Sequence, residues 1–434
     1  MSHNPRAVPA DAVADAGFRF SPWPLAALAS MLVAGFMTLG SFGIMAEDVK
    51  AELHLSDTML GSIQGVSAAI PLVLFSIPIG ILVDRTNRIH LIRFLVLAWT
   101  LGTLLTAFAA SVPVLFVARM MVGIGTTGAL TAALSLCADF APPVKRGRAM
   151  LIVTFGKSLG QGAAVTVAGW LLGQHLSDAI PSFDHLLPWR GTQFDLALVS
   201  VALTVPLLLL REPVRHEVEA GPGAPMRVLW RELWSRRLFL IPLFIGQASV
   251  FMADAAAAIW AAPVLIRSYH LTPADFAAWL GAIVLGTGML GAIVGGLVAD
   301  QGRRSGRRGG LLIGAVVAAG VGVPAALFPL MPTASAFGAG IGLLLLAGTV
   351  TGLITSVALT IYMPNELRGL SIGAFIAFAG LIGFGIAPPL VAWISQHLGG
   401  ESKLAPALAI VGVAVGVASF GAFVIAMRRA PDPV

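Results

Sequence analysis

The sequence predicts an all-α membrane protein of twelve transmembrane helices in two pseudo-symmetric six-helix halves. Apolar residues make up 57% of the 434-residue chain and charged residues only 11%, far below the roughly 25% of a soluble domain. Apolar stretches long enough to cross a bilayer recur along the whole chain, and one loop motif recurs at about half its length. The net charge of +6 lies mostly in short loops between these stretches, so we expect a lipid bilayer and no nucleic acid as partner.

Each predicted helix is a stretch of about 20 mostly apolar residues, the length that crosses a hydrocarbon core of about 30 Å. Backbone groups in lipid must bond internally, which makes these stretches helical. The first six are expected near residues 24–46, 58–83, 90–110, 114–138, 149–173 and 193–210. The second six are expected near residues 238–266, 274–298, 309–330, 336–361, 370–396 and 404–427. The chain is thus divided into a tail (1–23), a first bundle (24–210), a linker (211–237), a second bundle (238–427) and a tail (428–434).

The basic residues predict the orientation of the helices. Of the 27 Lys and Arg residues, 21 lie in loops and tails on the same side as the N-terminus. The opposite side holds four, namely Lys50, Arg190, Arg267 and Lys403. Cytoplasmic loops are the ones enriched in Lys and Arg. We therefore expect a multi-pass protein of the inner (plasma) membrane with both termini in the cytoplasm.

One loop motif occurs twice. It closes the second predicted span as Gly80-Ile-Leu-Val-Asp84-Arg85-Thr-Asn-Arg88 and the eighth as Gly296-Leu-Val-Ala-Asp300-Gln-Gly-Arg303-Arg304. The two aspartates are 216 residues apart, and an Arg-Gly pair also recurs after the fourth and tenth spans, at Arg146 and Arg368. The repeat indicates two parallel halves, the arrangement in which transporters bind solute near the membrane midplane.

With these motifs the chain resembles the major facilitator superfamily, whose loop motif Gly-x-Leu-x-Asp-Arg-x-x-Arg is complete from Gly80 to Arg88. The segments Arg119-Met-Met-Val-Gly-Ile-Gly and Arg211-Glu-Pro are similar to its spinster-like branch. That branch usually has an Asp-Arg pair in the first helix and a Glu where this chain has Thr126. The resemblance implies a transporter that works by alternating access on a small-molecule solute, and we expect a monomer.

The resemblance also implies a latch at the motif loops. It places Asp84 and Asp300 each near the N-terminus of a helix from the other half, where the helix dipole favours a carboxylate. Two ion pairs are expected, Arg85 with Asp139 and Arg303 or Arg304 with Glu366. The expected latch comprises Gly80, Asp84, Arg85, Arg88, Asp139, Arg146, Gly296, Asp300, Arg303, Arg304, Glu366 and Arg368. These contacts would hold the cytoplasmic side shut in the outward-facing state. The alternative, that basic loops only set the topology, explains the arginines but not the aspartates.

Three charged side chains fall well inside predicted spans, away from the span ends. Lys157 lies near the midplane of the fifth span, Asp254 near the middle of the seventh, and Arg119 in the outer part of the fourth. A charge at the bilayer centre costs at least about 2.5 kcal/mol, so each is a candidate functional residue. Gln161 follows Lys157 by four residues and shares its helix face. The candidate substrate-binding residues are Arg119, Lys157, Gln161, Asp254, Thr126, Thr127 and Trp260.

These charges predict the kind of solute. Arg119 or Lys157 is expected to hold an anionic group, with Asp254 as proton carrier or counter-ion. Because Asp254 is the only acid deep in a span, one cation lacks an acidic partner, and an anionic solute would supply it. The alternative is a buried Lys–Asp or Arg–Asp pair that only joins the halves. We expect secondary active transport of a small organic, anionic or amphipathic solute, with protons as a candidate coupling ion.

Two other functions stay open. One is proton-coupled efflux of hydrophobic or cationic compounds, with Asp254 as the recognition charge. The other is a transporter-like membrane sensor, for which the short tails leave little room for a signalling domain. The sequence shows no P-loop, no metal-ligand spacing and no grouping of catalytic side chains at one membrane depth. We therefore expect no enzyme, no cofactor and no metal.

Overall fold

The computed structural model describes residues 22–141, 145–180, 186–213, 234–362 and 365–431. Within them, twelve helical segments are long and apolar enough to cross a membrane, and no β-strand occurs. The first half comprises α2 (Pro22–Gly40), α3 (Ala46–Glu52), α4 (Asp57–Arg85), α5 (Arg88–Ala107), α6 (Val112–Phe140), α7 (Arg146–Leu176) and α8 (Pro188–Thr204). The second half comprises α10 (Arg237–Tyr269), α11 (Pro273–Arg304), α12 (Ile313–Ala325), α13 (Ala334–Tyr362), α14 (Asn365–His397) and α15 (Leu404–Arg428). The predicted fold class is confirmed.

Local sequence signals set several helix boundaries. The Ser56 hydroxyl accepts a hydrogen bond from the Met59 N–H at 3.2 Å where α4 begins, and the Asn87 side chain accepts one from the His90 N–H at 2.9 Å where α5 begins. Such N-caps satisfy N–H groups that have no partner inside the helix. The first span is interrupted, because α2 ends at Gly40 and a 3₁₀ segment, η1 (Ser41–Met45), leads into α3. The last carbonyl groups of α2 are thereby open to other donors.

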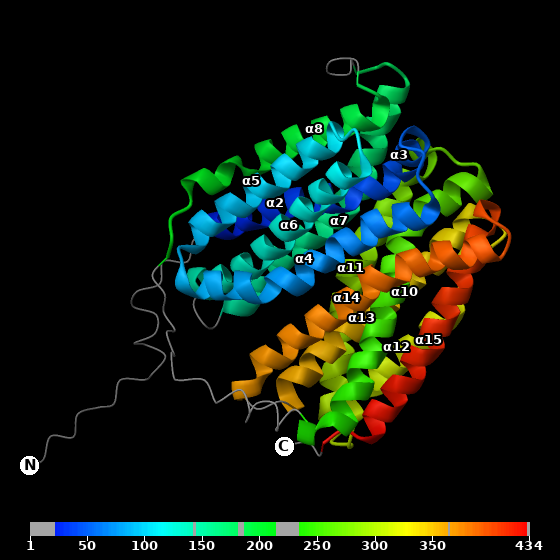
Figure 1. Cartoon of the computed structure of the whole chain (residues 1–434). Helices are drawn as coiled ribbons and strands as arrows, with labels where there is room; N and C mark the ends of the chain where they lie inside the picture. Colours follow the sequence, from blue (N-terminus) through cyan, green and yellow to red (C-terminus); the bar gives the residue numbers. More distant parts are fainter. Residues whose placement is uncertain (1–21, 142–144, 181–185, 214–233, 363–364, 432–434) are drawn as a thin grey trace, which may run out of the picture.

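The two halves lie side by side in Figure 1, the first coloured blue to green and the second green to red. Most of the contact between them is made by two helix pairs, α4 with α14 and α7 with α11. Glycines allow the close approach: a Cβ atom at Gly65 would collide with the Phe384 backbone in α14, and one at Gly169 would collide with Ala277 in α11. Both contacts lie in the part of the bundle nearer to α3.

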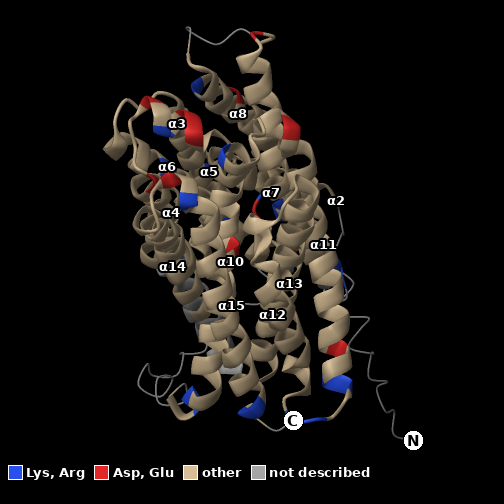
Figure 2. Cartoon of the chain, turned by 90° about the vertical axis from the view of Figure 1, so that its right-hand side faces the viewer, with Lys and Arg blue, Asp and Glu red and all other residues tan. Residues whose placement is uncertain are grey.

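The halves meet at one end of the bundle and separate at the other. We call these the α3 end, where α3 lies, and the motif end, which holds Arg88 and Arg303. At the α3 end one continuous hydrophobic cluster contains residues of both halves, whereas toward the motif end each half has a cluster of its own. Asp300 and Arg303, at the motif end of α11, are 62% and 65% exposed. Figure 2 shows the charged residues gathered mostly at these two ends. The structure is therefore closed at the α3 end.

Candidate functional site

The inner face of α7 carries two of the predicted site residues. Gly160 packs against the α2 backbone at Val33, and Gly162 packs against α11 at Gly281. Each residue turns a helix by about 100°, so Lys157 and Gln161 fall about 60° and 100° from Gly160, within the arc between these contacts. On the opposite arc, apolar Leu159 and Trp170 are 36% and 58% exposed, as expected of lipid-facing side chains.

Polar Gln161 is exposed on the inner arc, between a helix of each half. The expectation that Lys157 and Gln161 share a face is thus met by the helix geometry. The side chain of Lys157 is half-buried near the middle of α7, and its Nζ atom lies 5.5 Å from the centre of the Phe36 ring. Within the described residues, no hydrogen bond or ion pair to the Lys157 ammonium is found. An aromatic face stabilises a cation only partly, so this charge is available to an anionic ligand.

Asp254 lies near the middle of α10, in the opposite half. Its Oδ2 atom lies against Gly348 of α13, where even a Cβ atom would collide with the carboxylate. Its Oδ1 atom is buried without a hydrogen-bond partner among the described residues. One helical turn further, Ala258 approaches Gly43 of the first half. The Asp254 carboxylate thus packs against a helix of its own half, one turn from a contact between the halves. Among the described residues it forms no ion pair with Lys157.

Gln64 of α4 adds a third polar group with unused hydrogen-bonding capacity. Its Nε2 atom is buried and has no partner among the described residues, and its Oε1 atom lies close to Gly43. In contrast, Gln247 of α10 accepts a hydrogen bond from the Thr355 hydroxyl at 3.1 Å. Buried polar groups in folded proteins are nearly always paired, so the Gln64 amide has hydrogen-bonding capacity that a solute could use.

The structure gives Arg119 a role inside the first half. Its guanidinium donates hydrogen bonds to the carbonyl oxygens of Thr38, at 3.3 Å, and Leu39, and stands over the Phe42 ring at 4.9 Å. These carbonyls end α2, where the helix gives way to η1. A cation at a helix C-terminus is stabilised by the helix dipole. Arg119, which is 5% exposed, therefore caps a broken helix, and we remove it from the candidate binding residues.

We expect Arg119→Ala to lower stability without changing solute selectivity. The substitution leaves two buried carbonyl groups without donors and removes charge-assisted hydrogen bonds, together worth about 3 kcal/mol. Thermal unfolding in detergent measures the first effect. Competition between an anionic solute and its neutral analogue measures the second. An unchanged melting temperature combined with lost anion selectivity would return Arg119 to the binding site.

Three further candidates also have partners within the protein. The Thr126 hydroxyl donates to the Gly35 carbonyl of α2 at 3.2 Å, and Thr127 donates to the carbonyl one turn earlier in its own helix. Trp260 is fully buried, and its indole N–H donates to the Pro388 carbonyl of α14 at 3.0 Å. The Thr126 and Trp260 contacts join neighbouring helices, whereas the Thr127 contact lies within one helix. Of the seven predicted binding residues, Lys157, Gln161 and Asp254 remain without such partners.

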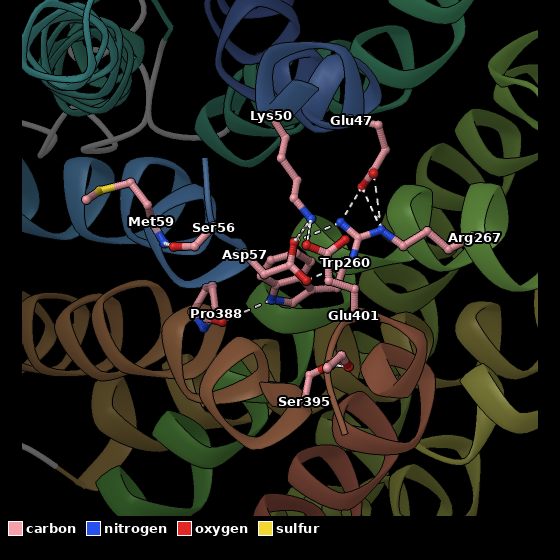
Figure 3. A network of polar contacts seen from close by, with 11 residues as sticks. Glu47, Lys50, Ser56, Asp57, Met59, Trp260, Arg267, Pro388, Ser395 and Glu401 are labelled. Carbon is pink, nitrogen blue, oxygen red and sulfur yellow. Dashed lines mark hydrogen bonds and ion pairs between the residues drawn. The ribbon is translucent and has the colours of Figure 1, made fainter. Parts of the chain in front are cut away.

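A cluster of five charged side chains joins the halves at the α3 end (Figure 3). We call Glu47, Lys50, Asp57, Arg267 and Glu401 the charge gate. Arg267 of α10 binds both Glu47 of α3, at 2.7 Å, and Asp57 of α4, at 2.7 Å. Lys50 binds Asp57 at 2.7 Å and also Glu401 of the second half. Asp57, at the centre of the network, is only 2% exposed, whereas Glu401 at its edge is 61% exposed. The network joins the two halves and holds the α3 end closed.

Sequence reasoning missed the charge gate. In the sequence, Lys50 and Arg267 stand out only as two of the four basic residues expected on their side of the membrane. The signal available was the segment from Val49 to Asp57, which resembles the spinster-like branch. Nothing in the sequence pairs it with residues more than 200 positions away.

At the motif end the structure corrects one predicted ion pair. Arg88, and not Arg85, contacts Asp139 of α6, and it also binds Glu212 at 2.7 Å. The reason is position: Arg88 begins α5, which packs along α6, whereas Arg85 ends α4 and is exposed. Arg88 and Asp139 belong to the first half, and Glu212 follows its last helix, so this network braces the first half and does not join it to the second.

The other predicted latch residues are either exposed or have side chains outside the described residues. Asp300 lies 4.0 Å from Arg303 of its own helix, with both side chains exposed. Arg304 is exposed, and Gly80 and Gly296 have little around them. The side chains of Asp84, Arg146, Glu366 and Arg368 lie outside the described residues.

Comparisons with known proteins agree with this architecture. The family model of the Major Facilitator Superfamily matches residues 26–388. An MFS-type efflux pump of Mycolicibacterium smegmatis is 26% identical over 260 residues, covering 59% of this chain and 57% of that protein. Human protein spinster homolog 1 is 28% identical over 287 residues, covering 61% of this chain and 52% of that protein. The chain thus spans little more than half the length of these curated relatives.

Solved structures share the fold. A bacterial homolog of the human lysosomal transporter Spinster, in an inward-facing and unoccupied conformation, has a TM-score of 0.75 at 20% identity, covering 95% of this chain and 96% of that one. A D-xylose-proton symporter has a TM-score of 0.67 at 16% identity, covering 96% and 99%.

Proposed function

Because the chain belongs to the major facilitator superfamily, we propose that it is a secondary active transporter that moves a small organic anion by alternating access. Lys157 is the binding cation in this proposal, with Gln161 beside it and Asp254 across the boundary between the halves. Amphipathic anions suit the site, because the Phe36 ring lies next to the Lys157 ammonium.

The observation that carries the proposal is the Lys157 ammonium itself. It lies halfway along a membrane helix, on the face between α2 of its own half and α11 of the other, and has no anionic partner among the described residues. A lone charge in this position is costly. An anionic solute compensates that cost, which makes the charge useful for binding. As a point charge, the ammonium accepts carboxylate, phosphate or sulfonate groups alike.

Alternating access follows from the two ends of the bundle. With the motif end facing the cytoplasm, the closed charge gate makes this conformation inward-facing. In the opposite conformation we propose that the gate separates and the motif residues of the two halves come together. Asp84 and Asp300 then meet helix N-termini of the other half, which stabilise their carboxylates. Asp300 is exposed in the present conformation, which leaves its side chain free to reach such a helix N-terminus.

Uptake into proteoliposomes tests this function. Radiolabelled carboxylates, organophosphates and organosulfonates of graded chain length are compared with neutral and cationic compounds, with and without a pH gradient. We expect saturable transport of at least one anion and none in liposomes without protein. Transport confined to neutral or cationic compounds would contradict the proposal.

A second candidate function is proton-coupled efflux of hydrophobic or cationic compounds. It is favoured by the unpaired Asp254 carboxylate and by similarity to a protein named as an efflux pump. Asp254→Asn separates the possibilities, because asparagine can neither carry a proton nor attract a cation. For a proton-coupled anion carrier, we expect the variant to bind the anion but to lose the response to a pH gradient. Loss of cation binding in the variant would instead support efflux.

The proposed topology has its own test. Alkaline phosphatase fused after Lys50 or Arg267 is expected to be active, because both residues lie at the α3 end, which we place outside the cytoplasm. Fusions after Arg88 or Arg308 are expected to be inactive. The reversed pattern at these sites would invert the orientation and make the observed conformation outward-facing.

A further inference from the structure

A groove runs along the surface of the second half, between α11, α12 and α13. It encloses about 440 Å³ and is walled mainly by apolar side chains, among them Val298, Val317 and Leu346. Val317 is 60% exposed, as expected of a surface in contact with lipid. None of the lining residues belongs to the first half or to the proposed solute site. The groove is therefore separate from the transport pathway.

The motif end of the groove is polar and positively charged. Gln301, Ser305 and Arg307 line it there. The exposed guanidinium of Arg307 makes no hydrogen bond or ion pair within the described part of the chain. Residues 300–308 hold four arginines and one acid, Asp300. This end of the groove thus has an excess of positive charge and a free guanidinium at its mouth.

The length of the groove matches one leaflet of a bilayer. It extends from Gly310, in the 3₁₀ segment η5 (Gly310–Leu312) at the motif end, to Val321 in α12. That is about 18 Å at rises of about 2.0 Å and 1.5 Å per residue. Half of a hydrocarbon core is about 15 Å. The charged end therefore lies at the depth of lipid head groups, and the apolar walls lie at the depth of acyl chains.

We propose that this groove is a binding site for an anionic phospholipid of the leaflet at the motif end. The acyl chain lies between α11, α12 and α13, and Arg307 binds the phosphate, with the Ser305 and Gln301 side chains beside it. Basic pockets between helices at a membrane surface bind anionic head groups in this way. A zwitterionic lipid adds an ammonium to a site already rich in arginine, so we expect it to bind less tightly.

Native mass spectrometry of the purified protein tests the proposal. Phosphatidylglycerol and phosphatidylcholine with identical acyl chains are titrated, and the ratio of their dissociation constants is measured. We expect wild type to prefer phosphatidylglycerol, and Arg307→Gln to reduce that preference about fivefold, the effect of one basic residue near a charged membrane surface. Arg428→Gln is the control, because it removes an arginine at the same end outside the groove.

A second pair of variants tests the apolar walls. Val317→Trp, which fills the groove, is expected to weaken both lipids, whereas Val417→Trp, at a similarly exposed position of α15, leaves them unchanged. Glycerol 3-phosphate at the same concentration should not displace the lipid, because it lacks acyl chains. The proposal is overturned if wild type binds both lipids equally, if Arg428→Gln has as large an effect as Arg307→Gln, or if glycerol 3-phosphate alone competes.

Discussion

Replacing Lys157 with alanine is expected to abolish transport of the anionic solute while the protein remains folded. The ammonium lies near the middle of the inner face of α7, and it has no ion-pair partner to lose among the described residues. Removing the partner of a desolvated charge costs at least about 2 kcal/mol, which lowers anion affinity about 30-fold. Binding in detergent and uptake in proteoliposomes measure the loss.

Two further variants make this result interpretable. Lys157→Met keeps the apolar stem beside Phe36 and should be as inactive as the alanine variant, with an unchanged melting temperature. Arg148→Ala removes an exposed cation from the same helix and should transport normally. If Lys157→Ala or Lys157→Met transports the anion at the wild-type rate, Lys157 is not the binding cation. The double variant Lys157→Ala/Asp254→Ala tests for a structural pair, whose joint removal would leave transport near normal.

Replacing Asp57 with asparagine is expected to open the α3 end. Asp57 binds Arg267 across the boundary between the halves and Lys50 within the first half. The coupling energy of close charge pairs at an interface starts at about 1.5 kcal/mol. The ratio of closed to open molecules should therefore fall at least about tenfold. Spin-label distances between Leu187→Cys and Leu398→Cys at the α3 end report this change, in a background with Cys137→Ala.

Glu52→Gln is the matched control for the gate. Glu52 lies at the same end and binds Arg190 at 2.9 Å, but both residues belong to the first half. Its loss should lower thermal stability and leave the distance distribution unchanged. If Glu52→Gln opens the α3 end as much as Asp57→Asn does, the effect is a general loss of ion pairs and not the opening of a gate between halves.

The sequence was sufficient for those features that depend on local pattern. Hydrophobic length predicts the spans, as for the tenth, expected near 336–361 and found as α13 (Ala334–Tyr362). The four-residue spacing of Lys157 and Gln161 placed both on one helix face, because that spacing is close to one helical turn. Depth along a helix also identified Asp254 as an intramembrane acid. These inferences need no knowledge of which helices are neighbours.

Features that depend on three-dimensional neighbours could not be inferred in this way. Arg119 was taken for a binding residue because its partners, the carbonyl groups of Thr38 and Leu39, become available only where α2 breaks at Gly40. Neither a proline nor a charged residue marks that break in the sequence. The structural contact of Trp260 is equally hidden in the sequence, since its partner is a backbone carbonyl 128 positions away.

The most direct test of the account compares one anion with its neutral analogue. A carboxylate identified in the uptake screen and its primary amide, identical in shape but uncharged, are titrated into wild type and Lys157→Met. We expect wild type to prefer the carboxylate by about 30-fold and Lys157→Met to bind both compounds equally. The binding role of Lys157 is contradicted if the ratio of the two affinities is the same in wild type and in Lys157→Met. It is also contradicted if Lys157→Met still prefers the carboxylate.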